Sequence, residues 1–245
     1  MGYNRRPGRY LCTKRVPMIM FLGCTISWKN LRTVIRIFLL KAASGGGGRF
    51  DAGMLYYTPQ IWCSDNTDAI NRTRIQYGTS FFYPVAAMGS HVSAVPNHQT
   101  GRVTSMHTRG VAAMSGTFGY ELNPALLNAK EKDRIRAQLA QYREYQELIR
   151  EGDYYRLSNP FQDNFAAWMV VSDDRSKALV SVIRLTAEAN PPAAYVTLKG
   201  MEEDAFYREK PTGKYIRELH LWRLEYCFLH AVSEYEAYQI ELERV

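Results

Sequence analysis

The chain has 245 residues, of which 46% are hydrophobic, so it can bury a sizeable core in one or two domains. Its net charge of +7 comes from its start: residues 1–50 hold ten Lys or Arg and no acid, and the rest holds 21 basic against 24 acidic residues. Nucleic-acid-binding domains spread basic and aromatic side chains over a folded face, so this distribution argues against a nucleic-acid partner.

The cysteines and the first apolar run exclude further classes of protein. Four cysteines without C-x-x-C spacing indicate neither a metal site nor a disulfide framework. The apolar run Pro17–Ser27 follows basic residues, but it is too short to span a bilayer and no cleavage site follows it cleanly. We therefore expect a cytoplasmic chain that does not contact a membrane.

Residues 1–42 are basic, with short apolar runs that do not hold a helical period for long. We expect them to form an aberrant, poorly ordered head. One part of it, Val34–Lys41 with the sequence V-I-R-I-F-L-L-K, is also compatible with a barrel strand.

Three segments within residues 44–102 hold the candidate site. Gly45–Gly48 have no side chains, so a ligand can approach the backbone directly. The run Gln60–Cys63 has the length of a strand, and Asp65 follows it in front of an expected helix. In a (β/α)₈ barrel, this position is on the catalytic rim. Residues 90–99 concentrate Ser, His, Asn and Gln side chains that suit a hydroxyl-rich ligand.

Each of these features also has a structural interpretation. Asp65 alone is compatible with a helix N-cap, and the glycine run with a linker. His91 and His98 have no third ligand at metal spacing, so we expect structural hydrogen bonds rather than a metal site.

The three segments read S-G-G-G-G-R-F-D, W-C-S-D-N-T-D-A and G-S-H-V-S-A-V-P-N-H-Q-T-G-R. In this order and spacing they resemble the signatures of the α-galactosidases of glycoside hydrolase family 36, the melibiases. The resemblance extends from about Ser44 to about Arg208. It implies a retaining hydrolase that removes terminal α-D-galactose from oligosaccharides such as melibiose and raffinose. It further implies that no cofactor is needed and that full-length members form homo-oligomers.

The resemblance also implies the site residues. Asp65 matches the general acid/base of the family. The family's sugar contacts fall at Ala43 and Gly45, with Ser44 and Gly46 beside them. Ala43 replaces the family cysteine that faces the sugar.

The family nucleophile stands in a K-W-D-M-N-R strand end before the glycine loop. Residues 1–42 contain no W-D and no D-M-N, and neither Asp51 nor Glu121 stands in such a motif. We therefore expect the nucleophile to be absent from this chain and the isolated chain to be inactive. The head is then out-of-frame or otherwise foreign sequence, and a divergent helix-and-strand pair is the alternative. The alternative function is a catalytically dead pseudoenzyme or a carbohydrate-binding remnant.

The pattern after Asp65 predicts the later βα units of a barrel. Asn66 or Thr67 is expected to cap the next helix, and Asp68 to lie in its first turn rather than to act as the nucleophile. We further expect a strand at Phe81–Ala87, with its rim at His91–Val95, and then a helix at Thr100–Ser115. The last barrel strand is expected at Thr117–Leu122, followed by a helix at Ala129–Glu151 that Gly152 ends.

From about Asp153 the hydrophobic period changes to two. Ala167–Ser172 and Ala178–Leu185 flank the turn Asp173-Asp174 as a hairpin, Ala194–Leu198 is a further strand, and the last ten residues suit an edge strand. The predicted fold class is α/β + β. A partial (β/α)₈ TIM barrel of the later βα units only, residues 43–152, precedes a C-terminal antiparallel β-sandwich domain, residues 153–245. Residues 213–233 fit the family poorly.

Overall fold

The computed structural model describes residues 26–27, 29–30, 41–43, 52–188, 194–210, 212–217, 225–228 and 233–245. Most of the expected head and the loop Gly45–Gly48 lie outside these ranges, and so does the expected strand at Val34–Lys41 apart from its last residue. Within the described ranges, no helix has both the length and the apolar character that a membrane crossing requires.

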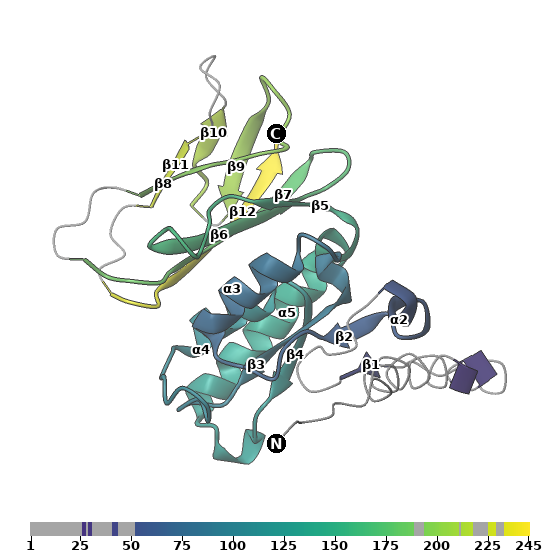
Figure 1. Cartoon of the computed structure of the whole chain (residues 1–245). Coiled ribbons are helices and arrows are strands. Elements are labelled where there is room, and N and C mark those ends of the chain that lie inside the picture. The colour runs from purple at the N-terminus through teal and green to yellow at the C-terminus, as the bar shows by residue number, and fades with distance from the viewer. Residues whose placement is uncertain are drawn as a thin grey trace, which may run out of the picture.

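The first half of the described chain forms an open parallel sheet. Its strands follow the order β1-β2-β3-β4, and helices connect them (Figure 1). The strands are β1 Lys41–Ala42, β2 Gln60–Trp62, β3 Met88–Ser93 and β4 Thr117–Glu121, and the helices are α2 Ala52–Tyr57, α3 Ala69–Thr79, α4 Met106–Ala113 and α5 Ala129–Glu151, with 3₁₀ turns η1 Val85–Ala87 and η2 Pro124–Leu126. Parallel neighbours with helical connections are the repeating unit of a βα barrel. The prediction of a partial barrel is therefore confirmed.

Helix α5 has the bounds that the sequence predicts. Asn128 and Glu131 close its start as a capping box: each side chain accepts a hydrogen bond at 3.0 Å from the backbone N–H of the other residue. Gly152 follows the helix in an extended conformation (φ −73°, ψ 161°), so it does not end the helix by a left-handed turn.

Three local predictions for the barrel part are wrong. The N-cap of α3 is Asp68, rather than Asn66 or Thr67. Residues 81–87 form turns and η1 instead of a strand, and Phe81 and Phe82 are exposed. Helix α4 begins only after Ser105, whose hydroxyl accepts from the backbone N–H of Thr108 at 3.0 Å.

The second half forms an antiparallel sheet in the order β10-β9-β12-β7-β6-β5, and a separate pair joins β8 to β11. The strands are β5 Asp153–Arg156, β6 Phe165–Val171, β7 Lys177–Arg184, β8 Ala194–Thr197, β9 Phe206–Lys210, β10 Tyr215–Arg217, β11 Glu225–Phe228 and β12 Ala237–Arg244. The predicted hairpin is present as β6 and β7. The prediction that the last strand lies at an edge is wrong, because β12 pairs with β7 on one side and β9 on the other.

Both faces of the six-stranded sheet carry buried hydrophobic clusters. One face packs against Val196 of β8 through residues such as Met169 and Val180. The other face packs against the helices: Trp168 and Ile183 belong to one buried cluster with residues of α3 and α4. In Figure 1, α3, α4 and α5 accordingly lie between the two large sheets. The C-terminal sheet thus forms part of the support of the barrel helices.

We predict opposite effects for two glycine-to-alanine substitutions. At Gly152, an added Cβ meets the carbonyl oxygens of Leu148 and Val171 at 2.6 Å, so Gly152→Ala should destabilise the fold by about 1–3 kcal/mol. At Gly78 in α3 the space is open, and Gly78→Ala should stabilise by up to about 1 kcal/mol. Urea unfolding followed by circular dichroism measures both, and equal effects would contradict the packing at Gly152.

Candidate active site

The carboxyl ends of the four parallel strands lie at one edge of the sheet. Ala42 of β1 is in register with Ile61 of β2, so Ala43 and Asp65 leave the sheet at neighbouring strand ends. Glu121 ends β4, which lies two strands away from β2. We call this edge the rim.

Asp65 is exposed in a bend between β2 and α3. Among the described residues, its carboxylate has no hydrogen-bond or ion-pair partner. The backbone beside it is fixed by local bonds: Ser64 Oγ accepts from Asn66 N at 3.1 Å, and Asn66 Oδ1 accepts from Asp68 N at 3.1 Å. The protein thus holds the turn and leaves the carboxylate available to a ligand.

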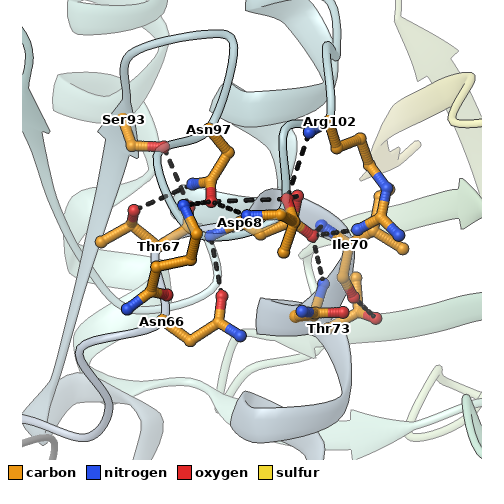
Figure 2. A network of polar contacts seen from close by, with 11 residues as sticks. Asn66, Thr67, Asp68, Ile70, Thr73, Ser93, Asn97 and Arg102 are labelled. Atoms are coloured by element: carbon orange, nitrogen blue, oxygen red, sulfur yellow. Dashed lines mark hydrogen bonds and ion pairs between the residues drawn. The ribbon is translucent and has the colours of Figure 1, made fainter.

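Asp68 anchors the start of α3, as Figure 2 shows. Its side chain is 2% exposed, and Oδ1 accepts from the backbone N–H groups of Ile70 at 3.1 Å and Asn71 at 2.9 Å. The same carboxylate forms an ion pair with Arg102, and Oδ2 accepts from Thr100 Oγ1 at 2.9 Å. This buried carboxylate ties the helix to the loop that follows β3.

A second set of bonds holds the residue before Asp68. Asn97 Nδ2 donates to Thr67 Oγ1 at 3.1 Å, and Ser93 Oγ donates to the carbonyl oxygen of Thr67 at 2.9 Å (Figure 2). Asn97 Oδ1 also accepts from Thr100 N at 3.1 Å, and Arg109 Nη1 donates to the Ser93 carbonyl oxygen at 2.6 Å. The Asp65 turn and the residue 93–102 loop therefore form one buried polar network.

Below the rim, aromatic and basic side chains meet. Lys41 Nζ lies 3.3 Å from His91 Nε2, and the His91 ring centroid lies 4.7 Å from that of Trp62. The buried Arg72 guanidinium lies 4.2 Å from the Trp62 ring centroid and donates to Cys63 Sγ at 2.8 Å. Burial, and then the charges of Lys41 and Arg72, lower the pKa of His91 to about 4. His91 is therefore neutral near pH 7 and accepts a hydrogen bond from Lys41.

Comparison with known proteins identifies this architecture. A family model described as "Melibiase" matches residues 14–152, which is more than half of the chain. The chain belongs to the melibiase family. A second model, "Glycosyl hydrolase family 36 C-terminal domain", matches residues 165–222. The resemblance of the three sequence motifs to this family is thereby confirmed.

Individual melibiases agree with this assignment. The chain is 65% identical over 201 residues to a bifunctional α-galactosidase/sucrose kinase of Mediterraneibacter gnavus. It is 56% identical over 177 residues to the α-galactosidase AgaA of Geobacillus stearothermophilus. Its structure superposes with a TM-score of 0.86 on an AgaA variant in complex with raffinose, at 46% identity and over 89% of this chain.

These melibiases are much longer than the matched region. The aligned part covers 82% of this chain but 22% of the Mediterraneibacter protein, and 72% of this chain but 24% of AgaA. In the superposition, 30% of the AgaA chain is covered. The chain thus spans about a quarter of the length of these relatives.

The predicted site residues of this melibiase are placed only in part. Ala43 and Asp65 lie at the rim, on neighbouring strand ends. Ser44, Gly45 and Gly46 lie outside the described residues, so their approach to Asp65 stays a prediction. The role of Asp65 as acid/base also stays a prediction.

Several polar residues that we interpreted as ligand-binding are engaged within the protein. Ser90 Oγ donates to Gln76 Oε1 at 2.8 Å, and Ser93 and Asn97 bind Thr67. His98 and Gln99 have exposed side chains. Within the described ranges, no group of His, Cys, Asp and Glu is arranged to hold a metal ion.

Two further residues, Arg102 and Arg109, support the rim. Arg102 pairs with Asp68 over a sequence distance of 34 residues, and Arg109 holds Ser93 from α4. The sequence shows Asp68 and the arginine that ends the third motif, but it does not show that the two side chains pair. Neither residue reveals its partner without the fold.

Proposed function

We propose that this chain carries the acid/base part of a retaining α-galactosidase, with Asp65 as the general acid/base. The substrates would be oligosaccharides with a terminal non-reducing α-D-galactose, such as melibiose and raffinose, and we place the protein in the cytoplasm. The observation that carries the proposal is the setting of Asp65: an exposed carboxylate without a described partner, at a strand's carboxyl end, on a turn held by buried bonds.

The chemistry suits this setting. A retaining glycosidase needs a carboxylic acid that protonates the departing oxygen and then, as carboxylate, activates water. Such a group has to face the ligand while its backbone stays fixed, because catalytic groups lose efficiency when their position relaxes. The buried Asp68 and Thr67 fix the turn, and no described residue competes for the Asp65 carboxylate.

We further propose that the chain alone lacks the nucleophile. Retaining enzymes place their two carboxyl groups ~5–5.5 Å apart. Glu121 ends a strand two places from β2, which is roughly 10 Å away at the usual strand spacing. Asp51 lies outside the described residues, and no nucleophile motif surrounds it.

The test uses the chain and a chimera. The purified chain should hydrolyse aryl α-galactosides no faster than buffer. A chimera in which the AgaA segment that precedes the equivalent of β1 replaces residues 1–40 should hydrolyse both these substrates and raffinose. Turnover by the isolated chain, lost in Glu121→Gln, would instead reveal a nucleophile in this sequence.

The same chimera distinguishes an active hydrolase from the alternative function. A pseudoenzyme or carbohydrate-binding remnant would bind raffinose in the chimera without hydrolysing it. The replacement of the expected cysteine by Ala43 at the rim favours this alternative enough to test it. Ala43→Cys in the chimera then measures what that single contact contributes to turnover.

A further inference from the structure

Tyr235 joins the C-terminal sheet to the rim. It lies just before β12, and its side chain packs against the buried cluster that contains Ala69 and Ile70, the first two residues of α3. The guanidinium of Arg102 lies over the same ring, with Cζ 5.0 Å from the ring centroid. A cation is attracted to an aromatic face within about 6 Å of its centroid. Tyr235 thus contacts both the start of α3 and the loop that follows β3.

The backbone of Tyr235 is held on both sides. Its N–H donates to the carbonyl oxygen of Arg184 at 3.1 Å, and its carbonyl oxygen accepts from Thr108 Oγ1 at 2.6 Å. Tyr235 has a φ of 63°, a left-handed conformation that costs a tyrosine free energy and that Asn and Gly adopt more readily. Strained residues of this kind persist where the surrounding structure fixes them, and they are frequent at functional sites. The strain therefore supports a role for the ring beyond filling space.

Arg102 connects this ring to Asp68. The Arg102 guanidinium forms an ion pair with Asp68 (Figure 2), which is the only carboxylate within ion-pair distance of it among the described residues. The Arg102 side chain is 26% exposed, and a pair open to water gains little because the long side chain has to be held in one geometry. An aromatic ring across the planar guanidinium restricts this freedom. Tyr235 therefore stabilises the ion pair that anchors Asp68.

Asp68 in turn fixes the backbone around Asp65. Asp68 N donates to Asn66 Oδ1 at 3.1 Å, and Asn66 N donates to Ser64 Oγ at 3.1 Å. The carboxylate of Asp65 has no described partner that would hold it, so its position depends on this backbone. A change at Arg102 can thus reach Asp65 through three residues of continuous chain.

We propose that Tyr235 is a positioning residue, through which the C-terminal sheet holds the Asp65 turn in place by way of Arg102. The catalytic consequence rests on the proposed function of Asp65. A general acid has to stay within hydrogen-bond reach of the departing oxygen, so a looser turn slows proton transfer without removing the contacts to the sugar.

Hydrogen exchange of the full chain, measured by mass spectrometry, tests this link without requiring activity. Tyr235→Asn removes the ring and introduces a residue that suits the left-handed backbone. Exchange of residues 66–71 should become about two- to fivefold faster, the equivalent of a partly exposed cation–π contact, whereas Tyr235→Phe should leave it unchanged. In an Arg102→Met background, Tyr235→Asn should add little, because the cation is already absent. Tyr215→Asn, at a 64% exposed tyrosine of the edge strand β10, is the matched control.

The chimera tests the catalytic consequence. Tyr235→Asn should lower kcat for raffinose by about two- to fivefold and leave KM unchanged, because the turn carries the proposed acid rather than the sugar contacts. The kcat/KM for a dinitrophenyl galactoside, whose leaving group needs little protonation, should be nearly unaffected. Tyr235→Phe should restore the kcat for raffinose.

The proposal is wrong if Tyr235→Asn leaves exchange of residues 66–71 unchanged, speeds exchange equally throughout the chain, or has its full effect in the Arg102→Met background. Equal losses of kcat/KM on both galactosides would also overturn it. Circular dichroism checks folding, and if Arg102→Met does not fold, the contrast between Tyr235→Asn and Tyr235→Phe decides. An inactive chimera would overturn the proposed function and leave the exchange result to decide the role of Tyr235, so the two proposals fail separately.

Discussion

Replacing Asp65 by alanine in the chimera should lower raffinose hydrolysis by about 10²–10⁴-fold, the usual contribution of a positioned general acid/base. The loss follows from the departing alkoxide, which has a high pKa and leaves slowly unless it is protonated. Asp65 is exposed and has no described partner, so its removal takes away the proton donor without leaving a buried group unpaired. The fold should therefore keep its stability, and the effect should be confined to turnover.

Leaving-group and nucleophile tests separate this role from a merely structural one. A dinitrophenyl galactoside needs little protonation, so Asp65→Ala should impair its cleavage much less than that of raffinose. Azide attacks the galactosyl-enzyme without a general base and should partly restore turnover. Asp173→Ala, in the exposed β6–β7 turn, is the matched control. Equal losses on both substrates and no azide effect would exclude Asp65 as the acid/base.

Asp68→Ala should destabilise the chain by about 3 kcal/mol. Loss of an N-cap costs about 1 kcal/mol, and loss of a hydrogen bond to a buried charged group about 1.5–3 kcal/mol. Asp68 has both roles, because Ile70 and Asn71 donate to it from α3 and Arg102 binds it from the loop after β3. The side chain of Arg102 is 26% exposed, so its charge can reach water when the partner is lost, which limits the penalty.

Urea unfolding measures this effect, with two comparison variants. Asp68→Asn keeps an oxygen for the helix N–H groups but loses the charge, so its cost should fall between wild type and Asp68→Ala. Asp133→Ala removes a pair with Arg136 in which both side chains are more than 70% exposed, and it should change stability by less than about 0.5 kcal/mol. If Asp68→Ala costs no more than Asp133→Ala, the buried network does not hold the turn.

The sequence predicts best those elements whose signals are local. Helix α5 carries its own capping pair and a long apolar period, and its predicted bounds coincide with the structure. The β6–β7 hairpin is similarly predictable from alternation around a two-aspartate turn. These patterns need no information about distant parts of the chain.

The predictions fail where contacts between residues far apart in the sequence determine the local structure. Residues 81–87 contain apolar residues of strand type, but Phe81 packs beneath the guanidinium of Arg156, 4.0 Å from its ring, instead of entering the sheet. Strand β12 resembles an edge strand because half of its residues are polar, yet Gln239 and Glu241 face helices and strands that bind them.

The same dependence on distant contacts determines which features of the candidate site the sequence can predict. The place of Asp65 after strand β2 is predictable because its motif is continuous in sequence, while its role stays a prediction. The polar residues of the third motif suggest a ligand-binding role, because composition alone shows hydrogen-bonding capacity without showing its partner. In the fold, Asn97 and Ser93 donate hydrogen bonds to Thr67.

The buried clusters on both faces of the six-stranded sheet have a consequence for cooperativity. Buried residues of α3 and α4 belong to the same cluster as Trp168 and Ile183, and Thr108 donates to the Tyr235 carbonyl oxygen at 2.6 Å. Separating the C-terminal sheet from the helices would expose this shared apolar surface on both pieces. We therefore expect the two halves of the chain to unfold as one unit, and a substitution in β12 to affect the helices that support the rim.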